Sequence, residues 1–131
     1  MHVRTRFVLL LCLLACGCGK KKSTDELLED LKGSQDRDRL IAVRLLPQRK
    51  GDAAQVVPAL TEALKHKDAD VRWSAAIGLG NFGEEAKDAI PTLQAAKRDR
   101  DARVREAAGV ALSRIDPNLA PKTAPGKARG K

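Results

Sequence analysis

The feature that most constrains the fold of this 131-residue chain is an internal repeat with a period of 33 residues. Residues 53–83 align with residues 86–116 without a gap, and ten of the 31 aligned pairs are identical. The register extends backward through seven more identical pairs: Leu27/Leu60, Glu29/Glu62, Leu31/Leu64, Lys32/Lys65, Arg39/Arg72, Ala42/Ala75 and Leu46/Leu79. A fixed period of this length is typical of solenoids, in which each copy stacks on its neighbours. The chain therefore holds three copies, at about residues 24–48, 52–83 and 85–116.

Each copy has the pattern of two helices. In the second copy, Val57, Leu60 and Leu64 fall on one helical face, and Val71 and Ala75 begin the apolar face of the next helix. Only 2% of the residues are aromatic, which favours closely packed helices over a sandwich or barrel. We predict an all-α fold, a short α-solenoid of about three helix pairs, with helices at residues 24–32, 37–46, 53–66, 70–82, 86–98 and 102–115.

Residues with the chemistry of helix ends lie at the ends of these segments. Asp68 or Asp70 is placed to accept a hydrogen bond from the first-turn amides of the second helix in copy two. Gly83 is placed to end that helix in a left-handed conformation. Pro47 and Pro117 interrupt the matching helices of the other copies.

Residues 57–83 read VPALTEALKHKDADVRWSAAIGLGNFG and resemble a HEAT repeat of the short type also found in phycocyanin-lyase-like proteins. Over about residues 24–116, the matching positions are first-helix prolines, turn aspartates and second-helix Val-Arg pairs: Pro58, Pro91, Asp68, Asp101, Val71, Arg72, Val104 and Arg105. The resemblance implies that the second helices line a concave face. It also implies that turn Asp and helix Arg residues bond between neighbouring repeats, in a ladder involving Arg39, Arg72 and Arg105.

The first copy departs from this pattern. It has Asp25, Gln35 and Asp38 where the other copies have the proline, the turn aspartate and the valine. A solenoid needs polar end units, so we expect this copy to serve as a polar end cap.

One candidate binding surface follows from helix geometry. At about 100° per residue, Trp73, Ile77 and Gly80 lie opposite the core face that is centred near Ala75. The equivalent positions are Leu40, Arg44 and Pro47 in the first copy, and Glu106, Val110 and Ser113 in the third. If the second helices line the concave face, Trp73 and Ile77 form an apolar centre with a charged rim, as an interaction hot spot does. The alternative is that Trp73 packs between adjacent repeats.

The N-terminus has the layout of a secretory signal peptide. Two arginines precede an apolar run from Phe7 to Ala15, which is shorter than the span of about 20 residues that a membrane helix needs. The end of this run, Leu-Leu-Ala-Cys, resembles a bacterial lipobox, which implies a signal peptide over residues 1–16 and lipidation of Cys16. Cys18 is the alternative site, and an ordinary secretory peptide is the alternative interpretation.

The net charge of +8 lies outside the repeats. Residues 23–116 hold 16 of the 25 cations and all 17 acids, so this region is close to neutral, which argues against a nucleic-acid-binding surface. Residues 17–23 form a Lys-rich spacer, which either contacts anionic headgroups or stays solvated. Residues 117–131 hold three Pro, two Gly and no acid, which predicts a disordered basic tail.

The repeats lack the groups that catalysis or metal binding needs. All three Cys lie in the first 18 residues, so His66 is the only metal ligand of the His or Cys type in the repeats. We therefore expect no enzymatic activity, no cofactor and no metal. The predicted function is binding of a protein or peptide by an exported protein that is lipid-anchored to a bacterial envelope membrane. The alternatives are an accessory subunit of a lyase-type enzyme that shares the repeat, and weak binding of an anionic polymer or nucleic acid by the tail.

Overall fold

The structure is a computed structural model that describes residues 21–119, and within that range it contains helices and no strand. The α-helices are α1 (Thr24–Lys32), α2 (Asp36–Leu45), α3 (Ala53–Ala63), α4 (Ala69–Phe82), α5 (Ile90–Ala96) and α6 (Ala102–Ile115). Short 3-10 segments are η1 (Leu46–Gln48), η2 (Lys50–Asp52), η3 (Gly83–Ala89) and η4 (Pro117–Leu119). The predicted all-α solenoid of three helix pairs is confirmed.

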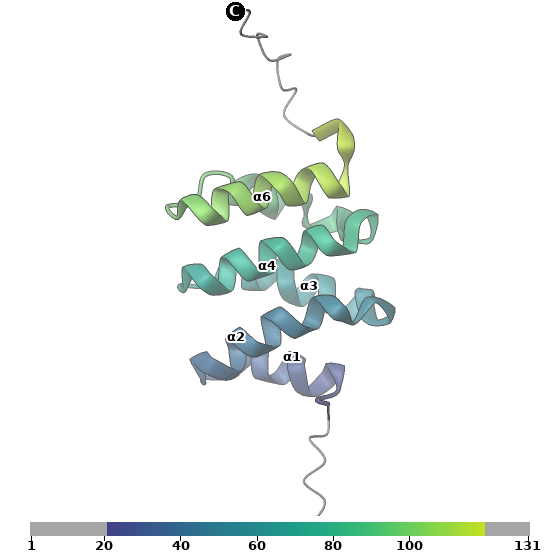
Figure 1. Ribbon diagram of the computed structural model, residues 1–131, viewed down its shortest axis with the longest axis vertical. Helices are drawn as coiled ribbons and strands as arrows, with labels where there is room; N and C mark the ends of the chain where they lie inside the picture. Colours follow the sequence, from purple (N-terminus) through teal and green to yellow (C-terminus); the bar gives the residue numbers. More distant parts are fainter. Residues whose placement is uncertain (1–20, 120–131) are drawn as a thin grey trace, which may run out of the picture.

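The helices form two layers along the long axis of the molecule (Figure 1). The second helices of the three pairs, α2, α4 and α6, lie side by side in one layer, and α4 contacts both of its neighbours. The first helices of the pairs lie behind them. Each first helix packs against the second helix of its own pair, so the chain climbs the stack one pair at a time.

The core repeats with the period of the sequence. Leu27, Leu60 and Leu93 follow one another at intervals of 33 residues, and all three are fully buried. Val71 and Val104 also occupy equivalent buried places, in the first turns of α4 and α6. Because each copy buries the same positions, stacking joins three small apolar units into one continuous core.

Side chains cap three of the helices. The carboxylate of Asp68 accepts a hydrogen bond from the backbone N–H of Asp70 at the start of α4, and Asp101 accepts one from Arg103 at the start of α6, each at 2.8 Å. Ser23 begins α1 with a reciprocal capping box. Gln35 makes no such bond at α2, as the missing turn aspartate of the first copy would suggest.

The chain ends α4 at Gly83, which has a φ of +57° as its position predicts. The following segment differs from the single helix expected at 86–98, because a 3-10 segment precedes a shorter α5. Pro91 lies in the first turn of α5, where its missing N–H costs little. The proline therefore starts an α-helix here, whereas Pro58 lies inside α3.

Two glycines allow close contact between the second helices. A Cβ on Gly78 would lie 2.7 Å from Cγ of Pro47, and a Cβ on Gly80 would lie 3.0 Å from Cα of Ala111. The expectation that Gly80 and Pro47 belong to the exposed face is wrong, because both are buried. Neighbouring second helices approach so closely that they cover these positions from the sides.

Within residues 21–119, none of the helices is both long enough and apolar enough to span a bilayer. The signal peptide and both candidate lipidation sites, Cys16 and Cys18, lie outside the described residues. So does most of the expected basic tail, although its first three residues form η4 instead of a disordered chain.

Candidate functional site

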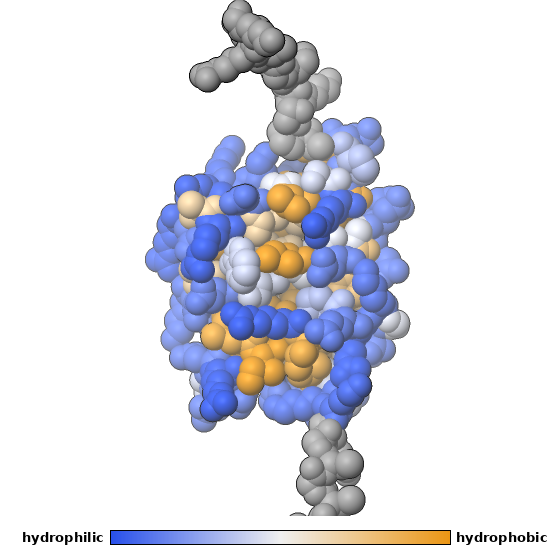
Figure 2. Space-filling view, viewed as in Figure 1, coloured by the Kyte–Doolittle hydropathy of each residue, from blue (hydrophilic) through white to orange (hydrophobic). Residues whose placement is uncertain are grey.

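The second-helix layer has an exposed apolar strip over α4 and α6, in addition to the exposed Ile41 and Leu45 of α2. Ile77 is 37% exposed and Val110 is 45% exposed, and Trp73 is half-buried beside them. We call these three residues the apolar strip. Figure 2 shows hydrophobic side chains in the middle of this face, bordered by hydrophilic ones, and a larger hydrophobic area lower down, toward the α1 and α2 end.

A hollow lies on each side of Trp73 and Ile77. The α2–α4 hollow has a volume of about 420 Å³ and is lined by Val43, Arg44, Pro47, Gln48, Trp73, Ser74, Ile77, Gly78 and Asn81. The α4–α6 hollow has a volume of about 390 Å³ and is lined by Trp73, Ile77, Gly80, Arg103, Glu106, Ala107, Val110, Ala111 and Arg114. Trp73 and Ile77 line both, so they form a ridge between two adjacent hollows.

The glycines explain why the ridge is raised. Gly78 and Gly80 carry no side chains, and Gly78 lines the α2–α4 hollow while Gly80 lines the α4–α6 hollow. The side chains of Trp73 and Ile77 therefore project between the α2–α4 hollow and the α4–α6 hollow. This arrangement exposes apolar surface that a soluble partner would bury favourably.

The rim of the site carries charges of both signs. Arg44 lines the α2–α4 hollow, and Glu106 lines the α4–α6 hollow. Arg103 is held in place by an ion pair with Asp70 at 2.9 Å, so its charge is partly neutralised. Arg44 and Glu106 make no ion pair with another residue in the range 21–119, which leaves both charges open to a partner.

One buried polar atom at this site lacks a hydrogen bond. Ser74 is 5% exposed and lines the α2–α4 hollow, and its Oγ has no partner among the residues described. A buried hydroxyl without a partner is destabilising, so its presence beside an exposed apolar ridge is notable.

The structure brings together five of the six predicted partner-binding residues. Trp73, Ile77, Arg44, Glu106 and Val110 all line the two hollows. Leu40 does not line either of them, and packs instead against the core. Both interpretations of Trp73 hold in part, because its ring packs against the core and also borders both hollows.

Helix counting did not predict the residues that form the sides of the two hollows. Asn81, Arg103 and Arg114 lie a turn away from the positions that helix counting selects, and they join the site because neighbouring helices place them there. Asn81 and Arg114 are 33 residues apart and share a hydrogen bond of 3.3 Å, so the repeat period was the signal that would have paired them.

The predicted ladder has one complete step, between the second and third repeats. Arg72 donates from Nε and Nη2 to the carboxylate of Asp99, at 2.8 and 2.9 Å. The hydrogen bond between them raises the pKa of Arg72 and lowers the pKa of Asp99. Burial opposes both shifts, but its effect is smaller. Both groups therefore stay charged at neutral pH.

The rest of the expected ladder is wrong. The turn aspartates cap their own helices, which uses the carboxylates that the ladder would need. Arg39 pairs with Asp36 of its own repeat at 2.6 Å. Arg105 donates to the carbonyls of Asp99 and Arg100, also in its own repeat.

The described residues contain no cluster of three or more His, Cys, Asp or Glu side chains suited to a metal ion. Stacked helix pairs with an exposed, mixed apolar and charged face define a helical repeat protein, a class whose stacked units present extended binding surfaces.

A family model described as HEAT repeats matches residues 24–113, and the chain belongs to this family. A similar solved structure is that of the complex of CpcE and CpcF of phycocyanin lyase from Nostoc sp. PCC7120, with a TM-score of 0.69 and 26% sequence identity. The match covers 81% of this chain and 42% of that chain, so this chain spans less than half the length of the structure that it matches. No curated protein sequence matched the chain.

Proposed function

We propose that this chain is a non-catalytic scaffold that binds a protein through a short peptide segment laid across α2, α4 and α6. The observation that carries the proposal is the ridge of Trp73 and Ile77 between two hollows. An aromatic residue at the centre of an apolar patch is the usual composition of an interaction hot spot. Two hollows on either side of one ridge suit two apolar side chains of the same segment.

Two further observations support a protein partner. The charges of Arg44 and Glu106 are of opposite sign and lie on opposite sides of the ridge, so they favour one orientation of a bound segment. The similar solved structure is itself a complex of two proteins, CpcE and CpcF. We infer that a protein occupies the face here as well.

The proposal includes export and a lipid anchor at Cys16, with Cys18 as the alternative site. The support is the N-terminal sequence, in which a short apolar run ends at a small residue and a Cys. Two or more acyl chains hold a protein firmly at a membrane. The protein would then present its binding face at the outer side of a bacterial envelope membrane.

The test has two steps, partner capture and then tryptophan fluorescence. The second step is possible because Trp73 is the only tryptophan in the chain. Partners are captured from envelope extract with wild-type protein and with the Trp73→Ala and Trp73→Glu variants. We expect both variants to lose the partner while their helix content is unchanged. Titration of wild-type protein with the purified partner should then change the emission of Trp73.

The matched control is Gln94→Ala, an exposed change on α5, on the opposite layer. Capture by this variant should equal that of wild-type protein. Equal capture by Trp73→Glu would reject the binding face, whatever the partner is. Intact mass of the membrane-extracted protein would separately test the anchor and distinguish Cys16 from Cys18.

A second candidate function, an accessory subunit of a lyase-type enzyme, is favoured by the similarity to the phycocyanin lyase structure. It differs from the first in requiring a chromophore. Absorbance of the purified protein after incubation with bilins separates the two. A stable new absorbance band would favour the lyase-type role, and its absence together with partner capture would favour the scaffold.

A further inference from the structure

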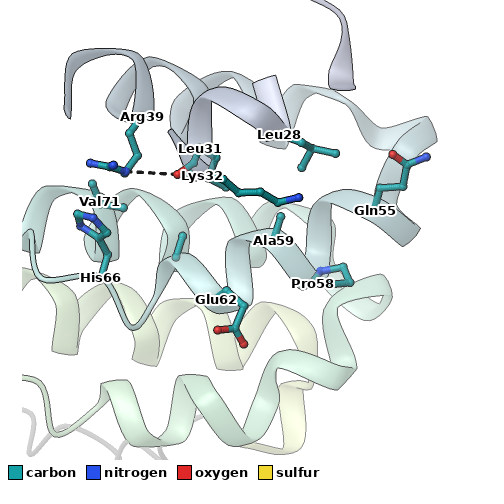
Figure 3. A pocket seen from close by; sticks show the side chains of 11 residues that line it. Leu28, Leu31, Lys32, Arg39, Gln55, Pro58, Ala59, Glu62, His66 and Val71 are labelled. Atoms are coloured by element: carbon teal, nitrogen blue, oxygen red, sulfur yellow. Dashed lines mark hydrogen bonds between the residues drawn. The ribbon is translucent and has the colours of Figure 1, made fainter. Parts of the chain in front are cut away.

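A larger hollow lies in the other layer, between α1 and α3, and it is unrelated to the apolar strip. Its volume is about 730 Å³. The lining includes the apolar side chains of Leu28, Leu31, Pro58, Ala59, Ala63 and Val71. Gln55 and Glu62 also line it, and the Glu62 carboxylate points away from Arg39 (Figure 3). Figure 3 shows Arg39 and His66 together at one end, with Lys32 extending across the opening toward Ala59. The hollow therefore has an apolar floor and a basic end.

The repeat relates this basic end to the Arg72–Asp99 ion pair. His66 stands 33 residues before Asp99, and Arg39 stands 33 residues before Arg72. The equivalence extends to the backbone, because Asp101 N–H donates to Oδ1 of Asp99 at 2.8 Å and Asp68 N–H donates to Nδ1 of His66 at 3.1 Å. His66 thus takes the structural place of Asp99 at the boundary between the first and second repeats.

The chemistry at the two boundaries is different. Asp99 gives Arg72 a carboxylate with two acceptor oxygens. His66 cannot do so, because its Nδ1 already accepts a hydrogen bond, and in the neutral imidazole the proton is then on Nε2. Burial and the nearby Arg39 both lower the pKa of His66, so the ring is neutral at physiological pH.

Both side chains at the basic end are therefore donors. Arg39 is 8% exposed and bonds to the Leu31 carbonyl, the Gly33 carbonyl and Asp36. Of these, only Asp36 carries a charge, and its side chain is 70% exposed, so the pair is weakened by water. Within residues 21–119, no carboxylate bonds Arg39 across this boundary as Asp99 bonds Arg72 at the next one.

We propose that the hollow between α1 and α3 binds a small amphiphile with a carboxylate head and an unbranched apolar tail. The carboxylate accepts from Nε2 of His66 and from the second N–H of an Nη nitrogen of Arg39, beside the imidazole that stands at the position of Asp99. The tail lies over Leu28, Leu31 and Ala59, and Lys32 covers it from the opening.

The probe is decanoate, compared with decanol, and binding to the full-length protein is measured by titration calorimetry. We expect decanoate to bind about tenfold more tightly than decanol or better, since hydrogen bonds to a charged group outweigh neutral ones. The decisive variant is His66→Asp, which introduces the carboxylate that the third repeat has naturally. It should keep its fold and lose decanoate binding by at least about tenfold.

Trp73→Ala is the control variant, since Trp73 is on the other layer. It should bind decanoate as wild-type protein does, and decanoate should not displace a peptide partner from the apolar strip. Equal binding of decanoate and decanol would overturn the proposal, as would unchanged decanoate binding by a folded His66→Asp protein. Neither result would test the scaffold function, which is tested separately by partner capture with the Trp73 variants.

Discussion

Arg72 and Asp99 join the second and third repeats through two parallel hydrogen bonds, Nε to Oδ2 at 2.8 Å and Nη2 to Oδ1 at 2.9 Å. Their side chains are only 6% and 12% exposed. The remaining nitrogen of Arg72 donates to the carbonyls of His66 and Lys67, at the turn that precedes α4. One guanidinium therefore holds a turn of its own repeat and a turn of the next.

Replacement of this carboxylate should destabilise the stack. In Asp99→Ala, the guanidinium of Arg72 stays buried without its counter-ion, and we expect unfolding to become easier by about 3 kcal/mol. Urea denaturation followed by circular dichroism measures this. Glu84→Ala removes an exposed ion pair with Lys87 and should change stability by less than about 0.5 kcal/mol. Similar losses of stability in the two variants would show that the buried ion pair contributes no more to the free energy of unfolding than the exposed one.

The same ion pair predicts how stability depends on pH. Arg72 holds the pKa of Asp99 below the ordinary value of 3.8, so the folded state favours the ionised carboxylate. The resulting stabilisation is present above the unfolded pKa and is lost as the pH falls through the lower, folded value. Wild-type protein should therefore lose more stability than Asp99→Asn on acidification below about pH 4. Parallel curves for the two proteins would contradict this.

Glycine substitutions test the close helix contacts. Gly78→Ala places a Cβ 2.7 Å from the rigid ring of Pro47 and 3.1 Å from Leu60, so we expect a loss of about 1–3 kcal/mol. Gly109→Ala, in the interior of α6, meets nothing within 4 Å and should instead stabilise the fold by about 0.5–1 kcal/mol. Thermal unfolding of both variants gives the sign of each effect. If both stabilise, the contact between η1 and α4 is looser than the geometry requires.

The unpartnered hydroxyl of Ser74 gives a stabilising prediction. Ser74→Ala removes a buried polar atom that has no hydrogen bond and leaves the neighbouring side chains in place. The third repeat already has Ala107 at the equivalent position, also buried. We expect a gain of about 1 kcal/mol in the free energy of unfolding. A loss of stability would show that the hydroxyl has a partner in solution.

Much of the fold could be predicted from single residues and their spacing. The constant interval between Leu27, Leu60 and Leu93 predicts a core built from three equivalent repeats, since identical surroundings require identical side chains. Counting about 100° per residue placed Trp73 and Ile77 on one exposed face, because an α-helix fixes that angle. The same counting predicted that Gly80 is exposed, although it is buried, because counting does not say how closely a neighbouring helix approaches.

The pairing between repeats was not predictable in the same way. Asp99 aligns with His66, so a search for matching residues passes over the aspartate that pairs with Arg72 across a repeat boundary. The conspicuous turn aspartates, Asp68 and Asp101, are used by their own helices instead.

The sequence by itself determined the helices and the residues that cap them, because these depend on neighbours a few positions away along the chain, and it determined the number of repeats through the 33-residue period. Only the tertiary structure decided that Arg72 meets Asp99, that Arg39 faces His66, and that two hollows border Trp73. Those relationships depend on the offset between stacked helix pairs, and that offset is set by how side chains such as Pro47 and Ala111 fit against the glycines of α4.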